Sequence, residues 1–303
     1  MSRMGLAAAI LLASAPAAVA GEADGDRPAV AVDVFASSDA DDTEVSKVGV
    51  SLDWRRASET DYAGVRVESA TFKPLGQDAT RDLRAYYRFA QPGERWSWSG
   101  QAGTDGHTVI GAVNVHNASR FRQEYFLERE IVETPQGVRD GIYYTFAGGA
   151  LDLPIDDRNN VTLVAAAQAF TGRNVRFHAR ANYVHVLQPD WGLSAQLRTR
   201  YFRSTEPGEY DYFSPREFAQ VVPVIQLRRR VAGWRILAAG GVGGQWQTGS
   251  GWTQARTFNA QVTSPPISKT WAVEAAFTYS NTPIGAGYTY DYRQMSLGVR
   301  RWF

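Results

Sequence analysis

The segment RNVRFHARANYVHV, residues 173–186, alternates between two kinds of side chain along most of its length. Every second residue from Val175 to Tyr183 is apolar or aromatic, and the residues between them, from Arg176 to Asn182, are polar. Because successive side chains of a β-strand point to opposite faces of the sheet, this period of two predicts a strand with one apolar and one polar face. The segment WGLSAQLRTRYF, residues 191–202, repeats the pattern.

The same alternation recurs along the chain, separated by clusters of Gly, Pro, Asn and Asp that are typical of turns. We therefore expect an all-β protein built from strands of about ten residues. Sixteen such segments are predicted, at residues 29–37, 45–55, 61–73, 80–90, 94–104, 107–116, 120–131, 141–153, 160–170, 174–187, 191–203, 217–230, 233–247, 252–264, 268–281 and 288–303.

The connections between these segments form two series. Those after odd-numbered strands are generally longer than those after even-numbered strands, as in bacterial outer-membrane barrels with long extracellular loops and short periplasmic turns. An even strand number, an apolar face and an arginine-rich polar face predict a closed antiparallel transmembrane β-barrel of about 16 strands with a wet lumen. A secreted β-sandwich is the alternative, but it seldom needs so many strands in one run.

The first twenty residues have the composition of a cleaved signal peptide. Arg3 is followed by an apolar stretch from Leu6 to Leu12 and by the small-residue site Ala18-Val19-Ala20. We expect a signal peptide at 1–20, a short periplasmic segment at 21–28, and a barrel at 29–303 in the outer membrane of a Gram-negative bacterium. The net charge of +1 argues against a nucleic-acid partner, and the chain has no cysteine for a disulfide.

Catalytic chemistry has little support in the sequence. The four histidines lie outside any recognisable Ser/His/acid motif, and no spacing suggests a metal site. We expect no enzyme activity, no catalytic residue, no metal and no cofactor.

Charged side chains on the predicted polar faces are candidates for the lumen wall. They could select solutes, or they could pair across strands and only solvate the wall. Their mixture of signs favours neither anions nor cations, and it suits a neutral or zwitterionic polymer. The candidates are Arg66, Glu68, Arg84, Arg88, Arg120, Arg122, Glu124, Glu128, Arg176, His178, Arg180, Arg198 and Arg200.

The longest predicted loop lies within STEPGEYDYFSPREF, residues 204–218. It brings together Tyr210, Tyr212 and Phe213, whose rings could stack on sugars in an extracellular loop. The alternative is that these rings pack the loop against the barrel rim.

Residues 128–246 resemble the C-terminal barrels of exopolysaccharide-export outer-membrane porins, those for cellulose and poly-N-acetylglucosamine, and the related YaiO-like barrels. The similar pieces are EREIVETPQGVRDGIYYTFAGGALDLPI (128–155), AFTGRNVRFHARANYVHV (169–186), YDYFSPREF (210–218) and GWRILAAGGVGGQW (233–246). The resemblance implies a sixteen-stranded barrel that passes a secreted polysaccharide and does no chemistry. Those export proteins usually carry a helical repeat region before the barrel, so the resemblance also implies a separate periplasmic scaffold or inner-membrane synthase as partner.

The main functional hypothesis is a porin-like channel for exopolysaccharide secretion. A general small-solute diffusion porin is the alternative, and an outer-membrane barrel enzyme or surface adhesin is the second alternative. The last segment, YDYRQMSLGVRRWF (290–303), is expected to pair with the strand at 29–37 and close the barrel. Its terminal Phe303 resembles the aromatic signal that the barrel-assembly machinery recognises, which makes this machinery and outer-membrane lipid expected partners.

Overall fold

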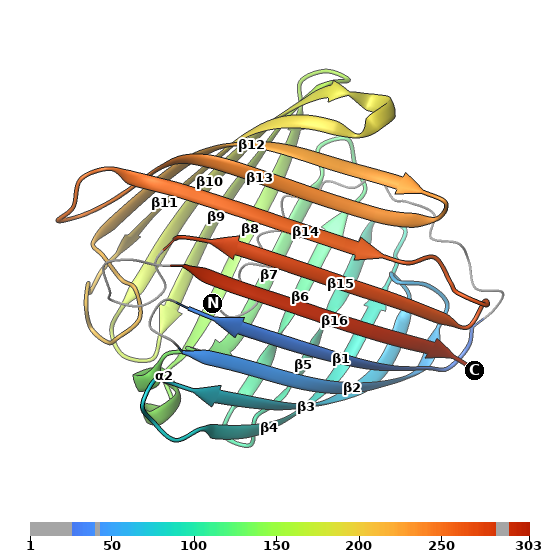
Figure 1. The fold of residues 1–303 in the computed structure, drawn as a ribbon, viewed down its shortest axis with the longest axis horizontal. Coiled ribbons are helices and arrows are strands. Elements are labelled where there is room, and N and C mark those ends of the chain that lie inside the picture. The colour runs from blue at the N-terminus through green and yellow to red at the C-terminus, as the bar shows by residue number, and fades with distance from the viewer. Residues whose placement is uncertain (1–25, 40–42, 283–290) are drawn as a thin grey trace.

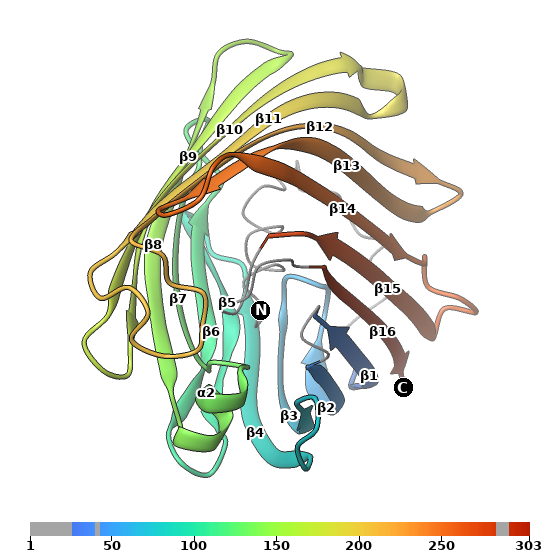
Figure 2. The same cartoon turned by 60° about the vertical axis from the view of Figure 1, so that its left-hand side comes forward.

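The sixteen predicted strands form one closed antiparallel barrel (Figures 1 and 2). A computed structural model describes residues 26–39, 43–282 and 291–303. Each strand pairs with its neighbours in the chain, and β1 pairs with β16. The prediction of a closed barrel is therefore confirmed. The predicted signal peptide, most of the predicted segment 21–28, and residues 283–290 lie outside the described residues.

The strand boundaries fall within a few residues of the predicted ones. The strands are β1 (Ala29–Ser38), β2 (Glu44–Arg56), β3 (Tyr62–Lys73), β4 (Thr80–Gln91), β5 (Trp96–Thr104), β6 (Val109–Asn117), β7 (Gln123–Ile131), β8 (Tyr143–Pro154), β9 (Asn159–Phe170), β10 (Val175–Gln188), β11 (Leu193–Ser204), β12 (Glu217–Val231), β13 (Trp234–Gln247), β14 (Thr253–Thr263), β15 (Trp271–Ser280) and β16 (Tyr292–Trp302). Among the described connections, two contain short helices, α2 (Pro135–Asp140) and η1 (Pro189–Trp191). No helix in the described ranges is long and apolar enough to span a membrane.

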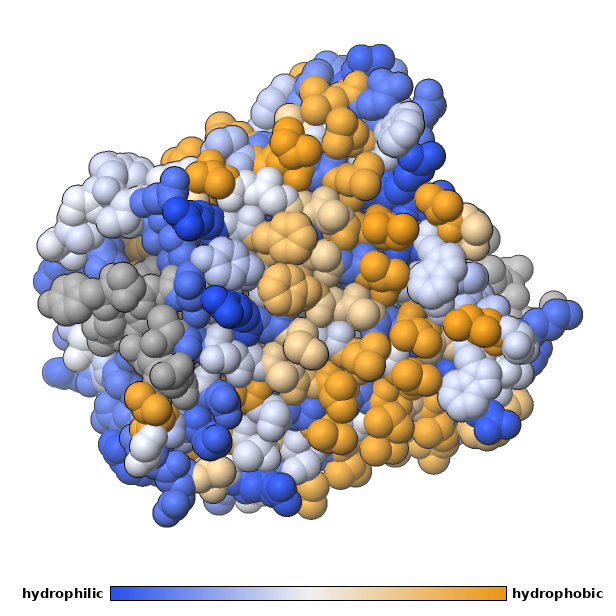
Figure 3. All heavy atoms as spheres, in the orientation of Figure 1, coloured by the Kyte–Doolittle hydropathy of each residue, from blue (hydrophilic) through white to orange (hydrophobic). Residues whose placement is uncertain are grey.

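The outer face of the barrel is apolar. Val32, Val50 and Val67 lie side by side on β1, β2 and β3, and 45%, 49% and 49% of their surface is exposed. Figure 3 shows apolar side chains spread over the middle of one face, and hydrophilic ones gathered at the end where α2 lies. A protein in water would bury such a surface, whereas lipid accepts it. The exposed belt therefore excludes the sandwich alternative and places the strands in a membrane.

Aromatic side chains stack on the outer face toward the end of the barrel where the β2–β3 and β4–β5 turns lie. Trp54 on β2 lies 5.9 Å from Tyr87 on β4, and Tyr87 lies 5.9 Å from Phe89, between ring centroids. Tyr and Trp favour the level of the lipid headgroups, because one end of the side chain is apolar and the other is polar. These rings mark one membrane interface.

Adjacent alanines on β15 offer a matched test of which face meets lipid. Ala275 pairs with Val262 and Leu297 on the outer face, whereas Ala276 pairs with Gln261 and Ser296 on the inner face. We expect Ala275→Arg to cost about 2–4 kcal/mol of barrel stability, because it places a charge in lipid near mid-strand. Ala276→Arg puts the same charge in a wet lumen and should fold normally. Heat-modifiable electrophoretic mobility measures the folded fraction, and equal losses in both variants would contradict the assignment of faces.

Candidate functional site: the barrel lumen

Most of the predicted lumen residues lie on the face of their strands opposite the exposed apolar belt. The alternation holds from one strand to the next, so that these side chains form rows across the inner wall. The residues placed in this way are Arg66, Glu68, Arg84, Arg88, Glu124, Glu128, Arg176, His178, Arg180, Arg198 and Arg200.

The expected placement of Arg120 and Arg122 on the strand needs correction. Strand β7 begins only at Gln123, because the Asn117 side chain accepts hydrogen bonds from the backbone N–H groups of Ser119 and Gln123 and closes a turn. Arg120 is exposed in this turn. Arg122 reaches the lumen wall only through its side chain, which lies 2.9 Å from the Glu124 carboxylate.

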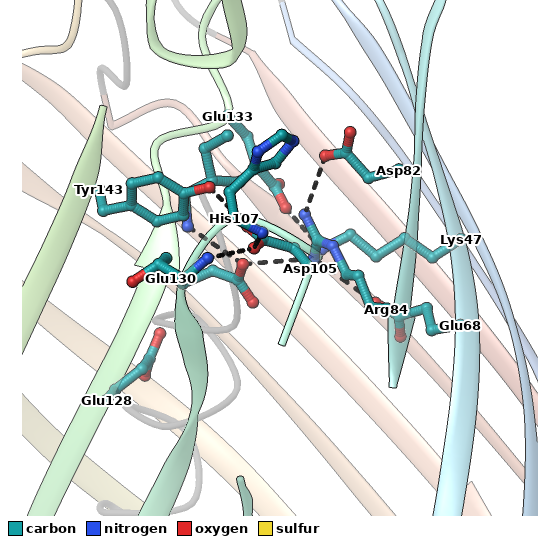
Figure 4. Close-up of polar contacts among 12 residues, drawn as sticks. Lys47, Glu68, Asp82, Arg84, Asp105, His107, Glu128, Glu130, Glu133 and Tyr143 are labelled. Carbon is teal, nitrogen blue, oxygen red and sulfur yellow. Dashed lines mark hydrogen bonds and ion pairs between the residues drawn. The ribbon is translucent and has the colours of Figure 1, made fainter. Parts of the chain in front are cut away.

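Arginines on the inner wall of β3 and β4 are paired with carboxylates. Arg84 is fully buried and lies 3.5 Å from Glu68 and 3.3 Å from Glu130 (Figure 4). Arg66 bridges Glu68, at 2.7 Å, and Asp33 on β1. Separating the partners of a buried ion pair would leave an uncompensated charge, which is costly. The arginines and carboxylates therefore hold one another in place. We call the inner faces of β1–β4 and β7 the paired wall.

Arg88 belongs to the same wall. It lies 3.4 Å from Asp53, which also lies 2.7 Å from Arg56, and it donates a hydrogen bond to Ser51. The predicted alternative that lumen charges pair across strands is therefore what the structure shows for Arg66, Arg84 and Arg88.

The connection between β7 and β8, residues 132–142, folds against the inner wall. We call it the α2 loop. Thr134 caps the helix by accepting a hydrogen bond from Gly137 N–H, Pro135 occupies its first turn, and Gly141 ends it with a φ of 66°. Val138 contacts a buried apolar cluster on the inner faces of several strands. Its members are Val45, Ala70, Phe72, Tyr86, Ile110, Ile131 and Tyr143. The sequence predicted only a loop here, although Thr-Pro followed by a later glycine is a recognisable helix start and stop.

An ion pair fixes the α2 loop on one side, and hydrogen bonds to a carboxylate fix it on the other. Glu133 lies 2.5 Å from Lys47 of β2 (Figure 4), so the loop narrows the lumen beside the paired wall. On the other side, Asp211 of the β11–β12 connection accepts hydrogen bonds from the Thr134 hydroxyl at 2.6 Å and from Gln136 N–H at 2.7 Å. Hydrogen bonds to a charged group are roughly twice as strong as neutral ones, so this carboxylate is a major anchor of the loop.

The β11–β12 connection, residues 205–216, is anchored in turn to the β9–β10 connection. Glu209 accepts hydrogen bonds from the backbone N–H groups of Arg173 and Asn174, at 2.8 and 2.9 Å. The Asn174 amide donates to the Tyr212 hydroxyl at 2.9 Å. The three connections, which lie at the end of the barrel expected to face outward, thus form one hydrogen-bonded rim.

The three aromatic residues predicted to contact sugars have different environments. Tyr212 is buried and stacks on Phe170 with ring centroids 4.2 Å apart, and Phe213 is buried against Phe218 at 5.6 Å. Burial raises the pKa of Tyr212 to about 12. These contacts occupy the faces that a sugar would need, so for Tyr212 and Phe213 the structure supports the alternative that the loop packs against the barrel. Tyr210 is only partly buried.

A carboxylate in the β5–β6 turn is also held in place. Asp105 in the β5–β6 turn accepts hydrogen bonds from the Tyr143 hydroxyl at 2.5 Å and from the backbone N–H groups of His107 and Thr108. Burial alone would raise the pKa of Asp105, but these hydrogen bonds outweigh it and lower the pKa below its ordinary value. Asp105 is therefore ionised at neutral pH and ties the turn to the start of β8.

The inner faces of β10 and β11 differ from the paired wall. His178 lies between Phe146, 5.2 Å away, and Phe202, 5.5 Å away, and its Nε2 is 3.3 Å from the Gln168 side-chain oxygen. Phe202 in turn stacks on Phe218. No carboxylate is paired with His178 among the described residues. In the same described part of the chain, no group of three or more His, Asp and Glu residues could hold a metal ion.

Comparison with known proteins supports the fold. No protein-family model and no curated protein matches the chain. A solved structure described as a bacterial polysaccharide outer membrane secretin superposes with a TM-score of 0.67, over 91% of this chain and 98% of that one, at 12% identity. The chain is an outer-membrane β-barrel.

Porins resemble it more distantly. Pseudomonas aeruginosa OccK5 (OpdH) has a TM-score of 0.43 at 8% identity, over 92% of this chain and 98% of that chain. Acinetobacter baumannii OccAB3 has a TM-score of 0.44 at 9% identity, over 92% and 99%. Every strand among the described residues is paired on both sides, so these strands leave no row of unpaired backbone groups facing lipid. With its apolar belt, such a barrel resides in the outer membrane of a Gram-negative bacterium.

The Asp211 anchor gives a direct test of how the α2 loop is held. Asp211→Ala removes two hydrogen bonds to a charged group, worth about 1.5–3 kcal/mol each, so the loop should open at least tenfold more often. Trypsin should then cleave after the exposed Arg139 at least about tenfold faster, as followed by mass spectrometry. Asp157→Ala, in the exposed β8–β9 turn at the opposite end of the barrel, is the control. Equal cleavage rates in the two variants would show that Asp211 does not hold the loop.

Proposed function

We propose that the barrel is a porin-like channel through which a secreted polysaccharide crosses the outer membrane. The observation that carries this proposal is a third region of the lumen, on β14, β15 and β16, which we call the neutral wall. Toward the start of β16 its inner face carries hydroxyl and amide side chains in adjacent rows, such as Asn259, Thr278 and Gln294, and the name refers to this part. Toward the end of β16 the same inner face carries two charged residues, Glu274 and Arg300. Sugar hydroxyls both donate and accept hydrogen bonds, and these side chains do the same.

The paired wall fits a passive role in such a channel. Because its arginines are matched with carboxylates, they keep the wall hydrated and contribute little net field to the lumen. Conduction needs contacts that are weak and repeated, so that a chain can enter and also leave. Repeated hydroxyl and amide groups on the neutral wall supply such contacts. The proposal includes no catalytic step and no cofactor.

The likeness to a polysaccharide secretin supports the proposal at the level of the fold, since that structure covers nearly the whole of both chains. A general small-solute diffusion porin is the second candidate. The α2 loop favours it, because a loop fixed between Lys47 and Asp211 narrows the passage. The barrel-assembly machinery, a periplasmic scaffold and an inner-membrane synthase remain predicted partners.

The absence of cysteine allows a clean test of passage. In a deletion strain complemented with Ala276→Cys, the only thiol faces the lumen, and in the Ala275→Cys control it faces lipid. A polyethylene-glycol maleimide should block the first channel and spare the second. We expect surface polysaccharide to fall to the level of the deletion strain only in the modified Ala276→Cys cells. Unchanged polysaccharide with reduced uptake of small sugars would favour the diffusion porin instead.

A further inference from the structure

Arginines dominate the inner face of β10 and β11. Arg180 lies directly opposite Arg200 in the strand register, and Arg198 lies on the same face as Arg200, two residues along β11. Like charges in directly opposed positions destabilise a sheet unless something compensates them. We call Arg180, Arg198 and Arg200 the arginine wall.

No carboxylate compensates this wall within the described residues. None of the three arginines forms an ion pair there, in contrast to Arg66 and Arg84 of the paired wall. Arg198 donates hydrogen bonds only to the neutral side chains of Gln196, at 3.0 Å, and Gln226, at 3.3 Å. The Nε atoms of Arg180 and Arg200 are buried and have no hydrogen-bond partner.

Aromatic rings compensate the charge only in part. The Arg200 guanidinium lies 5.4 Å from the Phe202 ring and 5.7 Å from Phe218, but neither ring is an anion. The neighbouring Arg176 also lies over Phe202, at 4.5 Å. It differs from Arg200 because it donates a hydrogen bond to the backbone carbonyl of Phe213. Among the residues that the structure describes, Arg180 has no ring contact and no hydrogen-bond acceptor. Arg180, Arg198 and Arg200 therefore remain able to accept an external partner.

The geometry of the arginine wall indicates the chemistry of that partner. A guanidinium presents its N–H groups as a planar fork that matches a carboxylate, phosphate or sulfate. Side chains of directly opposed residues on neighbouring strands start about 5 Å apart, so two guanidiniums can share one oxyanion. Burial of the lower parts of these side chains also weakens the competition from water.

We propose that the secreted polymer is anionic and that Arg180, Arg198 and Arg200 bind its carboxylate, phosphate or sulfate groups during passage. This inference rests on the proposed function and names its substrate class. It replaces the expectation, drawn from the mixed charges of the sequence, that the lumen suits a neutral or zwitterionic polymer. That expectation counted all charges together, whereas the structure matches the acidic groups with one set of arginines and leaves another set without them.

Binding of defined oligosaccharides tests the proposal. We would titrate the complete barrel in detergent with an oligogalacturonate, which carries a carboxylate on every sugar, and with a neutral maltooligosaccharide of equal length. Isothermal titration calorimetry should detect tighter binding of the acidic chain, weakening as salt screens the charges. Arg200→Gln should lower that affinity about threefold, and Arg180→Gln with Arg200→Gln about tenfold, from the loss of charges within several Å of the ligand.

Arg203→Gln is the matched control. Arg203 lies on the same strand but is exposed on the outer face, so its loss removes an equal charge without touching the lumen wall. The proposal is overturned if the acidic chain does not bind, if it binds no better than the neutral chain, or if Arg200→Gln and Arg203→Gln behave alike. Inorganic phosphate is a further probe, and equally tight, Arg200-dependent binding of phosphate alone would replace the polymer with a small anion.

The two proposals fail in different ways. If thiol modification at position 276 blocks export but oligogalacturonate binding is absent, the channel function stands and the anionic polymer is rejected. If oligogalacturonate binds through Arg200 but export is unaffected, the anion site stands and polysaccharide secretion is rejected.

Discussion

The pairing of β1 with β16 is the constraint on which the rest of the structure depends. Ala29 to Ser38 pair with Trp302 to Arg293 without interruption, so neither strand leaves a row of unpaired N–H and C=O groups. Each unsatisfied backbone group in the hydrocarbon core costs several kcal/mol, because no water is there to replace the partner. The register also fixes the faces, since a slip by one residue would turn every apolar side chain of β1 from lipid into the lumen. The same strand pairing therefore closes the barrel and determines which side chains face lipid and which face the lumen.

The inner face is divided further by how charge is matched. The paired wall on β1–β4 and β7 holds its arginines against carboxylates, and the neutral wall on β14–β16 offers hydroxyls and amides. The arginine wall on β10 and β11 has no carboxylate partner among the described residues. The α2 loop lies beside the paired wall, fixed by Glu133 on one side and Asp211 on the other. A polymer passing through the proposed channel would thus contact the arginine wall and the neutral wall rather than the paired wall. In the proposed channel, this division would favour anions, a preference that the total charge of the protein does not show.

The strands are predictable from the sequence because their signal is local. The alternation predicts a strand at 174–187 and β10 spans Val175–Gln188, since alternation within one strand does not depend on its partners. The α2 loop could not be placed in this way, because Lys47 and Asp211, which hold it, lie far away in the sequence. The same limit applies to Tyr212, whose ring is covered by Phe170 from another strand. The alternation also predicts that the strand of β7 includes Arg120, but β7 begins only at Gln123. The Asn117 side chain closes a turn there, which periodicity alone does not detect.

The charge selectivity of the channel is the most direct test, because it depends on whether the arginines without carboxylate partners face a continuous passage. The purified barrel would be reconstituted in a planar bilayer, and its reversal potential measured across a gradient of potassium chloride. An open channel with a preference for chloride is the predicted result. A channel that prefers potassium, or a barrel that does not conduct, would contradict the assignment of the lumen as a passage lined by an arginine wall.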